Sequence, residues 1–319
     1  MCPAIHFLGL HIPMYALMLA LGLASFFLLS HRALRDTWRD DRVTYHRILF
    51  VLCLSFVALG VFAFLFDGLF HSIEEGRLVF GGITWLGGVA GAFPALLLLT
   101  HFLVPKRRGY ALDLLDLAMP GLALAHALGR LGCFFGGCCY GRVTDSPLGV
   151  VFPVGSPAAS TYPNASGTGS LPVLPTQLFE AAFEVVLFAV ILLLARRTRR
   201  FHTAVWSMSY GIFRFILEFF RGDDRGSAGF PLSPAQVLSV LLFVFGLLVL
   251  LLRLGRMPAR LEKRLASWQA AADALPVTPI AACQGDDAAL LRHLFELRQI
   301  GAITEEEYEE KKQEILERM

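Results

Sequence analysis

Two arginines lie in apolar stretches of the sequence, where a charged side chain is costly to bury. Arg130 ends a hydrophobic segment and belongs to residues 126–142 (HALGRLGCFFGGCCYGR), and Arg214 lies inside residues 210–221 (YGIFRFILEFFR). A guanidinium group at membrane depth costs several kcal/mol unless it has a partner or a ligand. It keeps its proton, and its planar fork matches the oxygens of a phosphate group. Since phospholipids carry phosphate, the two arginines indicate a membrane protein that handles lipid headgroups.

Carboxylates accompany these arginines. Glu218 follows Arg214 by four residues and Arg221 follows Glu218 by three, so the three side chains can share one face of a helix. Glu180 lies near the start of another apolar segment. Such carboxylates can neutralise or orient the arginines when no lipid is bound. The alternative is a charge cluster that only pins helices together, which is less favoured because burying charges rarely stabilises a fold.

His126 is the candidate for a general base. It precedes Arg130 by four residues, so the two lie on the same face if the helix continues. A histidine at membrane depth can exchange protons near neutral pH. A structural histidine bonded to a neighbouring helix explains the same position, and the sequence leaves both interpretations open.

The segments that carry these residues have the composition of membrane spans. Of the 319 residues, 55% are hydrophobic and only 17% are charged, whereas soluble domains carry about a quarter charged residues. A bilayer core needs about 20 apolar residues per helix. Asp113, Asp116 and Pro120 interrupt the fourth such stretch, which can tilt or border a cavity. The expected fold is all-α, a polytopic membrane protein with seven transmembrane helices near residues 10–30, 48–70, 80–104, 111–129, 177–195, 203–220 and 234–254.

The basic residues of the loops predict the orientation. The connections after the first, third, fifth and seventh spans are rich in Arg and Lys, and the others hold few. By the positive-inside rule the N-terminus lies outside and the C-terminus is cytoplasmic, so the Arg130 end of the fourth span faces outward. Because these residues alternate with apolar spans and do not cover one face, no nucleic-acid partner is expected. The basic clusters lie at residues 32–47, 106–108, 196–200 and 253–264.

The C-terminal tail differs in kind from the rest of the chain. Leucines at helical spacing stop at Gly301, and Thr304 with Glu307 forms a capping box for a second helix. Residues 291–316 resemble the short C-terminal domain found on many bacterial proteins, which implies self-association or a protein partner. The expected domains are a membrane domain (1–255), a basic and then Ala/Pro-rich linker (256–286) and a short helical cytoplasmic tail (287–319).

Four blocks of sequence, in this order, resemble the prolipoprotein diacylglyceryl transferase family. They are residues 129–142 with PLGVVFP at 147–153, then LPVLPTQLFE at 171–180, residues 210–221, and SPAQVLS at 233–239. Between the first two blocks, residues 143–176 are rich in Pro, Gly, Ser and Thr and are expected to form an irregular outer head. The resemblance covers about residues 1–255. It implies a multi-pass transferase of the bacterial inner membrane, which moves the diacylglyceryl group of phosphatidylglycerol to a prolipoprotein cysteine, forming a thioether and releasing glycerol phosphate.

That reaction explains the residue types. The thiol needs a base, and the departing phosphate needs cations, which Arg130 and Arg214 can supply bidentately. No cofactor is expected. The catalytic residues are expected to be Arg130, Arg214, Glu180 and His126, and the substrate-binding residues Arg130, Arg142, Gln177, Tyr210, Arg214, Glu218 and Arg221.

The sequence departs from the family pattern in the part that handles protons. Leu86 stands where the family has a catalytic histidine, Cys133 and Gly136 replace asparagines, and Cys138 replaces an acidic residue. Residues 173–174 are Val-Leu where the family has a proline–histidine stretch. The two arginines are kept. Two alternatives to the family's reaction therefore stay open, a divergent transferase with another acceptor and an inactive paralogue that binds phospholipid.

Three of the six cysteines, Cys133, Cys138 and Cys139, lie in one outward loop. On an oxidising face, Cys133 can form a disulfide with Cys138 or Cys139. Their spacing is not a recognised zinc pattern, and no histidine follows at finger spacing, so no metal is expected. A membrane thiol redox protein is a further alternative, but it leaves the two distant arginines unexplained.

Overall fold

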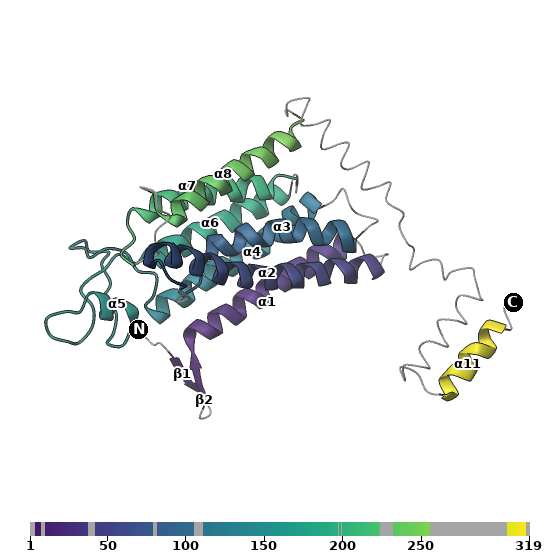
Figure 1. The fold of residues 1–319 in the computed structure, drawn as a ribbon, viewed down its shortest axis with the longest axis horizontal. Coiled ribbons are helices and arrows are strands. Elements are labelled where there is room, and N and C mark those ends of the chain that lie inside the picture. Colours follow the sequence, from purple (N-terminus) through teal and green to yellow (C-terminus); the bar gives the residue numbers. More distant parts are fainter. Residues whose placement is uncertain are drawn as a thin grey trace. The chain divides into compact units, whose positions relative to one another are not determined.

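The computed structural model describes residues 4–7, 10–37, 42–78, 82–104, 111–196, 198, 200–223, 232–255 and 305–316. The chain divides into two units, Met1–Gln269 and Ala270–Met319. The first unit is a bundle of helices (Figure 1). Its long helices are α1 (Met14–Thr37), α2 (Arg42–Glu75), α3 (Trp85–Leu103), α4 (Ala111–Gly136), α6 (Thr176–Ala195), α7 (His202–Glu218) and α8 (Pro234–Arg253).

Six of the described helices are long and apolar enough to cross a membrane, namely α1, α2, α3, α4, α6 and α8. The predicted helical membrane architecture is therefore confirmed. The expected span near 203–220 corresponds to α7, which has 17 residues and is not among the six.

The chain before α1 differs from the expectation of a span beginning near residue 10. Residues Ala4–Phe7 (β1) and Leu10–Pro13 (β2) pair as antiparallel strands, and the helix begins only at Met14. Pro13 explains this boundary, because the residue before a proline is held in an extended conformation.

Helix α4 is continuous from Ala111 to Gly136 although Asp113, Asp116 and Pro120 interrupt its apolar sequence, and it extends beyond the expected end near 129. Pro120 is tolerated inside it, as in many membrane helices whose neighbours satisfy the freed backbone groups. Helix α1 packs closely on α4, because a Cβ on Gly22 of α1 would meet the Ala125 carbonyl oxygen of α4 at 3.0 Å. Since the helix continues past residue 129, Arg130 is a helical residue and shares a face with His126.

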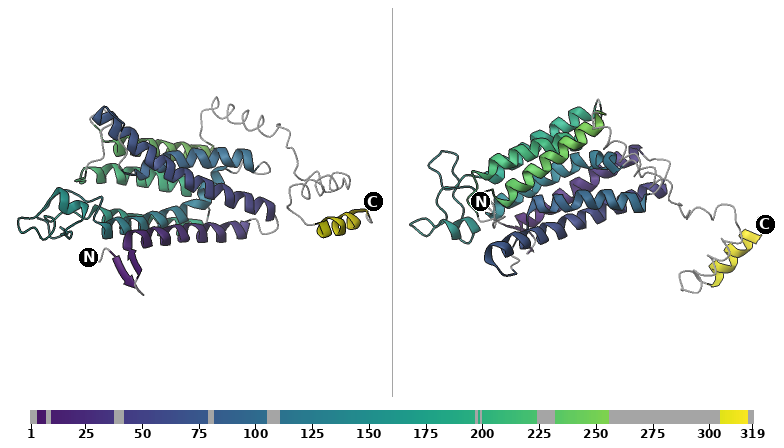
Figure 2. Two further views of the ribbon diagram at one scale, coloured as in Figure 1. Left: turned by 60° about the horizontal axis from the view of Figure 1, so that its bottom comes forward. Right: turned by 45° about the horizontal axis from the view of Figure 1, so that its top comes forward.

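The helices of the bundle pack in pairs, α1 on α4, α2 on α3 and α7 on α8, while α6 lies against α4 and α7 (Figure 2). Large apolar side chains such as Leu115, Met119 and Trp206 fill the core. Buried charged side chains gather where α4, α6 and α7 meet, and they form the site described below.

An irregular head connects α4 to α6, as predicted from its Pro- and Gly-rich sequence. It contains one short helix, α5 (Pro157–Thr161), and isolated bridges. The Gly141 N–H donates to the Leu174 carbonyl at 2.8 Å, and the Arg142 N–H donates to the Phe220 carbonyl at 2.9 Å. These bonds tie the head to the start of α6 and to the end of α7. The head has its own buried apolar cluster of Tyr140, Phe152, Ala158 and Val173.

The described residues of the second unit form one helix, α11 (Glu305–Leu316), in which Tyr308 and Ile315 are buried. This is the second of the two helices predicted for the tail. The leucine repeat before Gly301, the capping residue Thr304 and the linker at 256–286 lie outside the described residues.

Candidate active site

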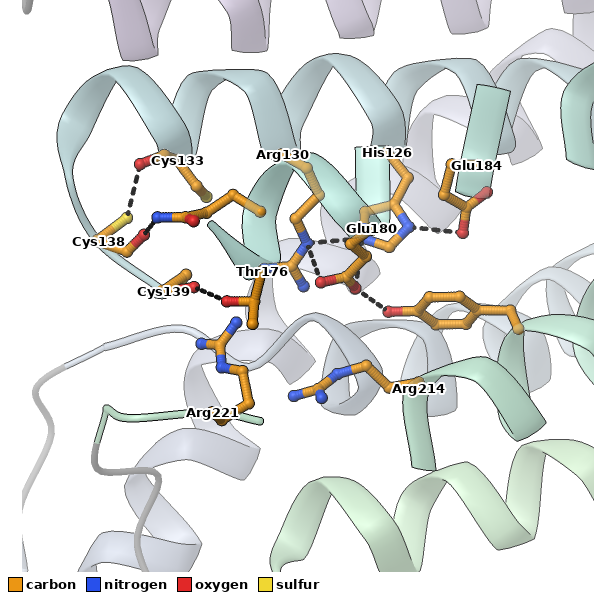
Figure 3. A network of polar contacts seen from close by, with 12 residues as sticks. His126, Arg130, Cys133, Cys138, Cys139, Thr176, Glu180, Glu184, Arg214 and Arg221 are labelled. Carbon is orange, nitrogen blue, oxygen red and sulfur yellow. Dashed lines mark hydrogen bonds and ion pairs between the residues drawn. The ribbon is translucent and has the colours of Figure 1, made fainter. Parts of the chain in front are cut away.

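Arg130 of α4 is held by a carboxylate of α6. Its Nε atom lies 3.0 Å from Oε2 of Glu180 and donates to Nε2 of His126 at 3.1 Å. All three side chains are buried. Both contacts use Nε, so they fix the arginine without occupying its two terminal nitrogens (Figure 3).

His126 is engaged at both ring nitrogens. Nδ1 lies 2.9 Å from Oε1 of Glu184, and Nε2 accepts from Arg130 while lying 3.5 Å from Oε1 of Glu180. The ring also stacks on Trp85, with the centroids 4.1 Å apart. A neutral imidazole that carries its proton on Nδ1 satisfies both contacts, because Nε2 is then an acceptor for the guanidinium N–H. In this geometry His126 orients Arg130.

Tyr210 and Trp206 of α7 complete the polar network. The Tyr210 hydroxyl donates to Oε1 of Glu180 at 2.6 Å, and Trp206 Nε1 donates to Oε2 of Glu184 at 3.0 Å. Sequence reasoning includes Tyr210 in the site but misses Glu184 and Trp206. The signal for Glu184 was available, because it follows Glu180 by one helical turn inside an apolar segment.

Arg214 is paired within its own helix. Its Nη1 atom lies 2.5 Å from Oε2 of Glu218, four residues later, as the spacing predicts. Glu218 also accepts from the Ser233 hydroxyl at 2.9 Å. Ser233 is the N-cap of α8 and accepts from the Gln236 N–H at 3.2 Å. The cap of α8 therefore helps to hold the carboxylate that neutralises Arg214.

Arg130 and Arg214 line one small pocket, which has a free volume of about 20 Å³. The two guanidinium groups point toward the same space from α4 and α7 (Figure 3). Two like charges repel each other strongly in a low-dielectric pocket, so this arrangement favours an anion between them. Leu86, where the sequence resemblance implies a histidine, belongs to the wall and offers no proton acceptor. The remaining lining residues are Thr84, Trp85, Pro234 and Ala235.

An apolar cavity adjoins this pocket between α3 and α8. Its free volume is about 170 Å³, and it shares Leu86 with the arginine pocket. A cationic pocket beside a hydrocarbon-lined cavity suits a molecule with an anionic head and apolar chains. The lining of the cavity includes Leu86, Val89, Phe93, Leu238, Leu242 and Phe245.

Arg221 is placed differently from Arg214. Helix α7 ends at Glu218, so Arg221 follows the helix, and the expected shared face holds only Arg214 and Glu218. Both oxygens of Asp223 accept from Arg221, from Nε at 2.8 Å and from Nη2 at 2.6 Å. This bidentate pair occupies the Nε/Nη2 edge of the guanidinium group and leaves Nη1 without a hydrogen bond among the described residues, so substrate binding by Arg221 stays a prediction.

Two further residues predicted to bind substrate support the backbone around the site. Arg142 donates through Nε to the carbonyl oxygen of Arg221 at 3.3 Å. Gln177 is fully buried and donates to the carbonyl oxygen of Cys138 at 2.7 Å. Neither side chain belongs to the lining of the arginine pocket.

The predicted cysteine cluster lies where α4 ends. The Sγ atoms of Cys133, Cys138 and Cys139 lie within 4.8 Å of one another. The pKa of the Cys138 thiol is raised to about 11. A hydrogen bond with Cys133 lowers this pKa, but a hydrogen bond with Cys139 and burial together raise it by more. The disulfide between Cys133 and Cys138 or Cys139 stays a prediction.

The fold and the site define a class of protein, a polytopic helical membrane protein with a buried two-arginine pocket beside an apolar cavity. Comparison with known families is more specific. The model for prolipoprotein diacylglyceryl transferase matches residues 3–252, and the model for the short C-terminal domain matches residues 289–316. The chain belongs to the prolipoprotein diacylglyceryl transferase family and carries a short C-terminal domain.

Several bacterial enzymes are similar to the chain over nearly their whole length. Phosphatidylglycerol–prolipoprotein diacylglyceryl transferase 2 of Clostridium perfringens (strain 13 / Type A) is 30% identical, over 80% of this chain and 95% of its own. The phosphatidylglycerol–prolipoprotein diacylglyceryl transferase of Geobacter sulfurreducens is 32% identical, over 73% of this chain and 87% of its own. Together with the membrane-crossing helices, this membership identifies a multi-pass protein of the bacterial inner membrane.

Proposed function

We propose that the protein transfers the diacylglyceryl group of phosphatidylglycerol to a cysteine thiol of a prolipoprotein and releases glycerol phosphate. The observation that carries the proposal is the pocket lined by both Arg130 and Arg214, which adjoins an apolar cavity. The names of the similar enzymes describe the same donor and acceptor.

The arginines act on the leaving group. The thiolate sulfur attacks the glyceryl carbon that carries the phosphodiester oxygen, so a C–S bond forms as the C–O bond breaks. The bonding electrons leave with the phosphate, which gains a negative charge. Terminal nitrogens of Arg130 and Arg214 stabilise that charge, and they do so more strongly in the transition state than in the bound lipid.

Glu180 keeps Arg130 in place between turnovers. Its carboxylate forms an ion pair with Arg130 and accepts from the Tyr210 hydroxyl, so it neutralises the arginine from the side that faces α6. His126 holds the same Nε atom from α4. Both residues are assigned to positioning Arg130. That His126 also acts as the general base stays a prediction, because its Nε2 must first release Arg130 to accept a proton.

The apolar cavity between α3 and α8 is the proposed place for an acyl chain of the donor lipid. Leu86 lies at the junction of this cavity with the arginine pocket, where the glyceryl backbone would lie. The lipid would then have its phosphate between the arginines and its hydrocarbon against Phe93 and Leu242.

The proposed orientation counts α7 as the sixth of seven spans in chain order, with the N-terminus outside and the C-terminus in the cytoplasm. The Arg- and Lys-rich connections on one side support it, and the site then faces outward. A reporter that is active only outside the cytoplasm should work when fused within 155–170 and fail when fused at 319. The opposite result would reverse the orientation.

The tail is proposed as a cytoplasmic association module, separate from the membrane domain at 1–255. Helix α11 alone buries few apolar side chains, and so small a unit gains stability by packing against a copy of itself or another protein. Deleting residues 287–319 should leave transfer activity intact and change the oligomeric state or the partners that co-purify.

A second candidate function is phospholipid binding without transfer. It is favoured by Leu86, which removes a proton acceptor from the pocket wall while both arginines remain. Expression in a bacterium depleted of its own transferase separates the two. Restored growth and lipoprotein modification, absent with Arg130→Ala, supports transfer; failure of the well-expressed wild-type chain supports binding alone.

A further inference from the structure

The end of α4 brings two cysteines together by its backbone geometry. Gly137 has a left-handed φ of 68°, its N–H donates to the Phe134 carbonyl at 3.2 Å, and the Cys138 N–H donates to the Cys133 carbonyl at 3.2 Å. This pair of hydrogen bonds is the Schellman motif, which places the second residue after the helix against a residue of its last turn. That contact is usually hydrophobic, and here both positions are cysteines.

A second left-handed residue adds the third thiol. Cys139 has a φ of 64°, a conformation that residues other than glycine adopt rarely. The start of α6 holds this segment, because Gln177 donates to the Cys138 carbonyl at 2.7 Å and the Thr176 hydroxyl donates to the Cys139 carbonyl at 2.9 Å. The surrounding structure therefore maintains an unusual backbone in which three thiols converge.

The spacing of the sulfur atoms is close to that of a metal site. All three Sγ atoms lie within 4.8 Å of one another. Zn–S bonds of about 2.3 Å at tetrahedral angles put sulfur atoms about 3.8 Å apart, so small side-chain movements suffice. The three cysteines are only partly buried, and the ligand group among the described residues contains these three alone. Three protein ligands with an accessible face are typical of zinc sites that bind an external fourth ligand.

We propose that Cys133, Cys138 and Cys139 bind Zn²⁺ as three thiolates and leave the fourth position for an external thiol. Binding releases three protons and gives a site with one net negative charge. Arg130 lies one helical turn before Cys133 and interacts electrostatically with Cys133 and Cys139, so it offsets that charge. Soft thiolate ligands favour zinc over magnesium or calcium.

The role of the fourth position rests on the proposed transfer function. An acceptor cysteine loses its thiol proton to solvent as its sulfur binds zinc, which supplies a thiolate beside Arg130. That sulfur then attacks the glyceryl carbon, the C–O bond to phosphate breaks, and the thioether product leaves the metal. In this way the cluster makes the acceptor nucleophilic although Leu86 cannot act as a base.

The first test measures metal in the full-length protein, purified reduced in detergent and supplied with Zn²⁺. The wild type and the control Cys53→Ser should hold one zinc per chain, since Cys53 lies exposed in α2. Cys133→Ser, Cys138→Ser and Cys139→Ser should each bind at least about 10- to 100-fold more weakly, the loss seen even for outer-shell changes. Wild-type protein that takes up no zinc, or equal zinc in a triple serine variant, overturns the site. In protein isolated without reductant, a Cys133 disulfide as the main form does the same.

The second test needs no variant and separates the site from the function. Co²⁺ bound in place of Zn²⁺ should show thiolate charge-transfer absorption, and a lipobox peptide should shift it, whereas the same peptide with Ser for Cys should not. An unchanged spectrum overturns the open fourth position. If chelated protein keeps full transferase activity, the zinc role fails while the transfer function stands. If zinc and the peptide bind but no transfer occurs with or without metal, the site stands and the transfer function fails.

Discussion

Arg130 meets Glu180 side-on: its Nε atom lies 3.0 Å from Oε2, and the two terminal nitrogens are not used in this contact. The arrangement neutralises a buried arginine and still leaves its fork directed toward the pocket that Arg214 shares. Arg221, whose Nε and Nη2 both bind Asp223, shows the opposite arrangement in the same region. The difference is that Arg130 keeps both terminal nitrogens clear of its carboxylate, whereas Arg221 uses one of them to bind its carboxylate.

Removing the charge of Glu180 should destabilise the protein. Glu180→Gln keeps the shape but leaves a buried guanidinium without its counter-charge, which costs about 3–5 kcal/mol when one partner of a buried pair is lost. The free energy of unfolding in detergent, compared with that of the wild type, measures this loss of stability. The control is Glu75→Gln, since Glu75 pairs with Arg77 on an exposed surface and should change stability by less than about 1 kcal/mol. Equal stability of the two variants contradicts the role given to Glu180.

Arg221→Lys should affect the fold more than catalysis. Lysine cannot reproduce the bidentate bond to Asp223, so the unfolding temperature should fall. We expect kcat/KM to stay within about threefold of wild type, a change of under 1 kcal/mol. A much larger loss of kcat/KM with normal stability would indicate that Arg221 binds substrate, as the sequence predicts.

His126→Ala should lower kcat more than it weakens lipid binding. The ring fixes Arg130 through Nε2 and is anchored by Glu184 through Nδ1, so its loss should misplace the group that we propose acts in the transition state. Kinetics with phosphatidylglycerol and a direct lipid-binding measurement give the two quantities. Unchanged kcat contradicts both the positioning role and the base role, and Leu86→His then tests whether a base at the pocket wall raises turnover.

Cys138 should react slowly near neutral pH in reduced, metal-free protein. Its pKa of about 11, against an ordinary 9.0, lowers the reactive thiolate fraction about 100-fold at pH 7–8. The raised pKa means that the fold favours the neutral thiol, so this contribution to stability is complete below about pH 9 and is lost as pH rises toward 11. Iodoacetamide labelling, read by peptide mass spectrometry, should accelerate about tenfold per pH unit up to that value. Rapid labelling at pH 7 contradicts the prediction.

The helical membrane architecture could be predicted because the length of an apolar stretch is a local property of the sequence. The same is true of the pair Arg214 and Glu218, which depends only on helical spacing. Contacts between different helices could not be predicted from local sequence. The hydrogen bonds from Trp206 to Glu184 and from Ser233 to Glu218 depend on how α6, α7 and α8 pack. The meeting of the cysteines needed the left-handed turn at Gly137, for which a glycine just past an apolar helix is a known but weak signal.

We propose that Arg130 and Arg214 together stabilise the departing phosphate. Purified protein with phosphatidylglycerol and a lipobox peptide allows kcat to be measured from glycerol phosphate release. Arg130→Lys and Arg214→Lys keep the charge but lose the planar fork. Each should raise the activation free energy by about 1–3 kcal/mol, which lowers kcat roughly 5- to 150-fold, with a smaller change in KM. Arg77→Lys, at an exposed pair, should match wild type. Full activity in both pocket variants would contradict the account and make the two arginines structural.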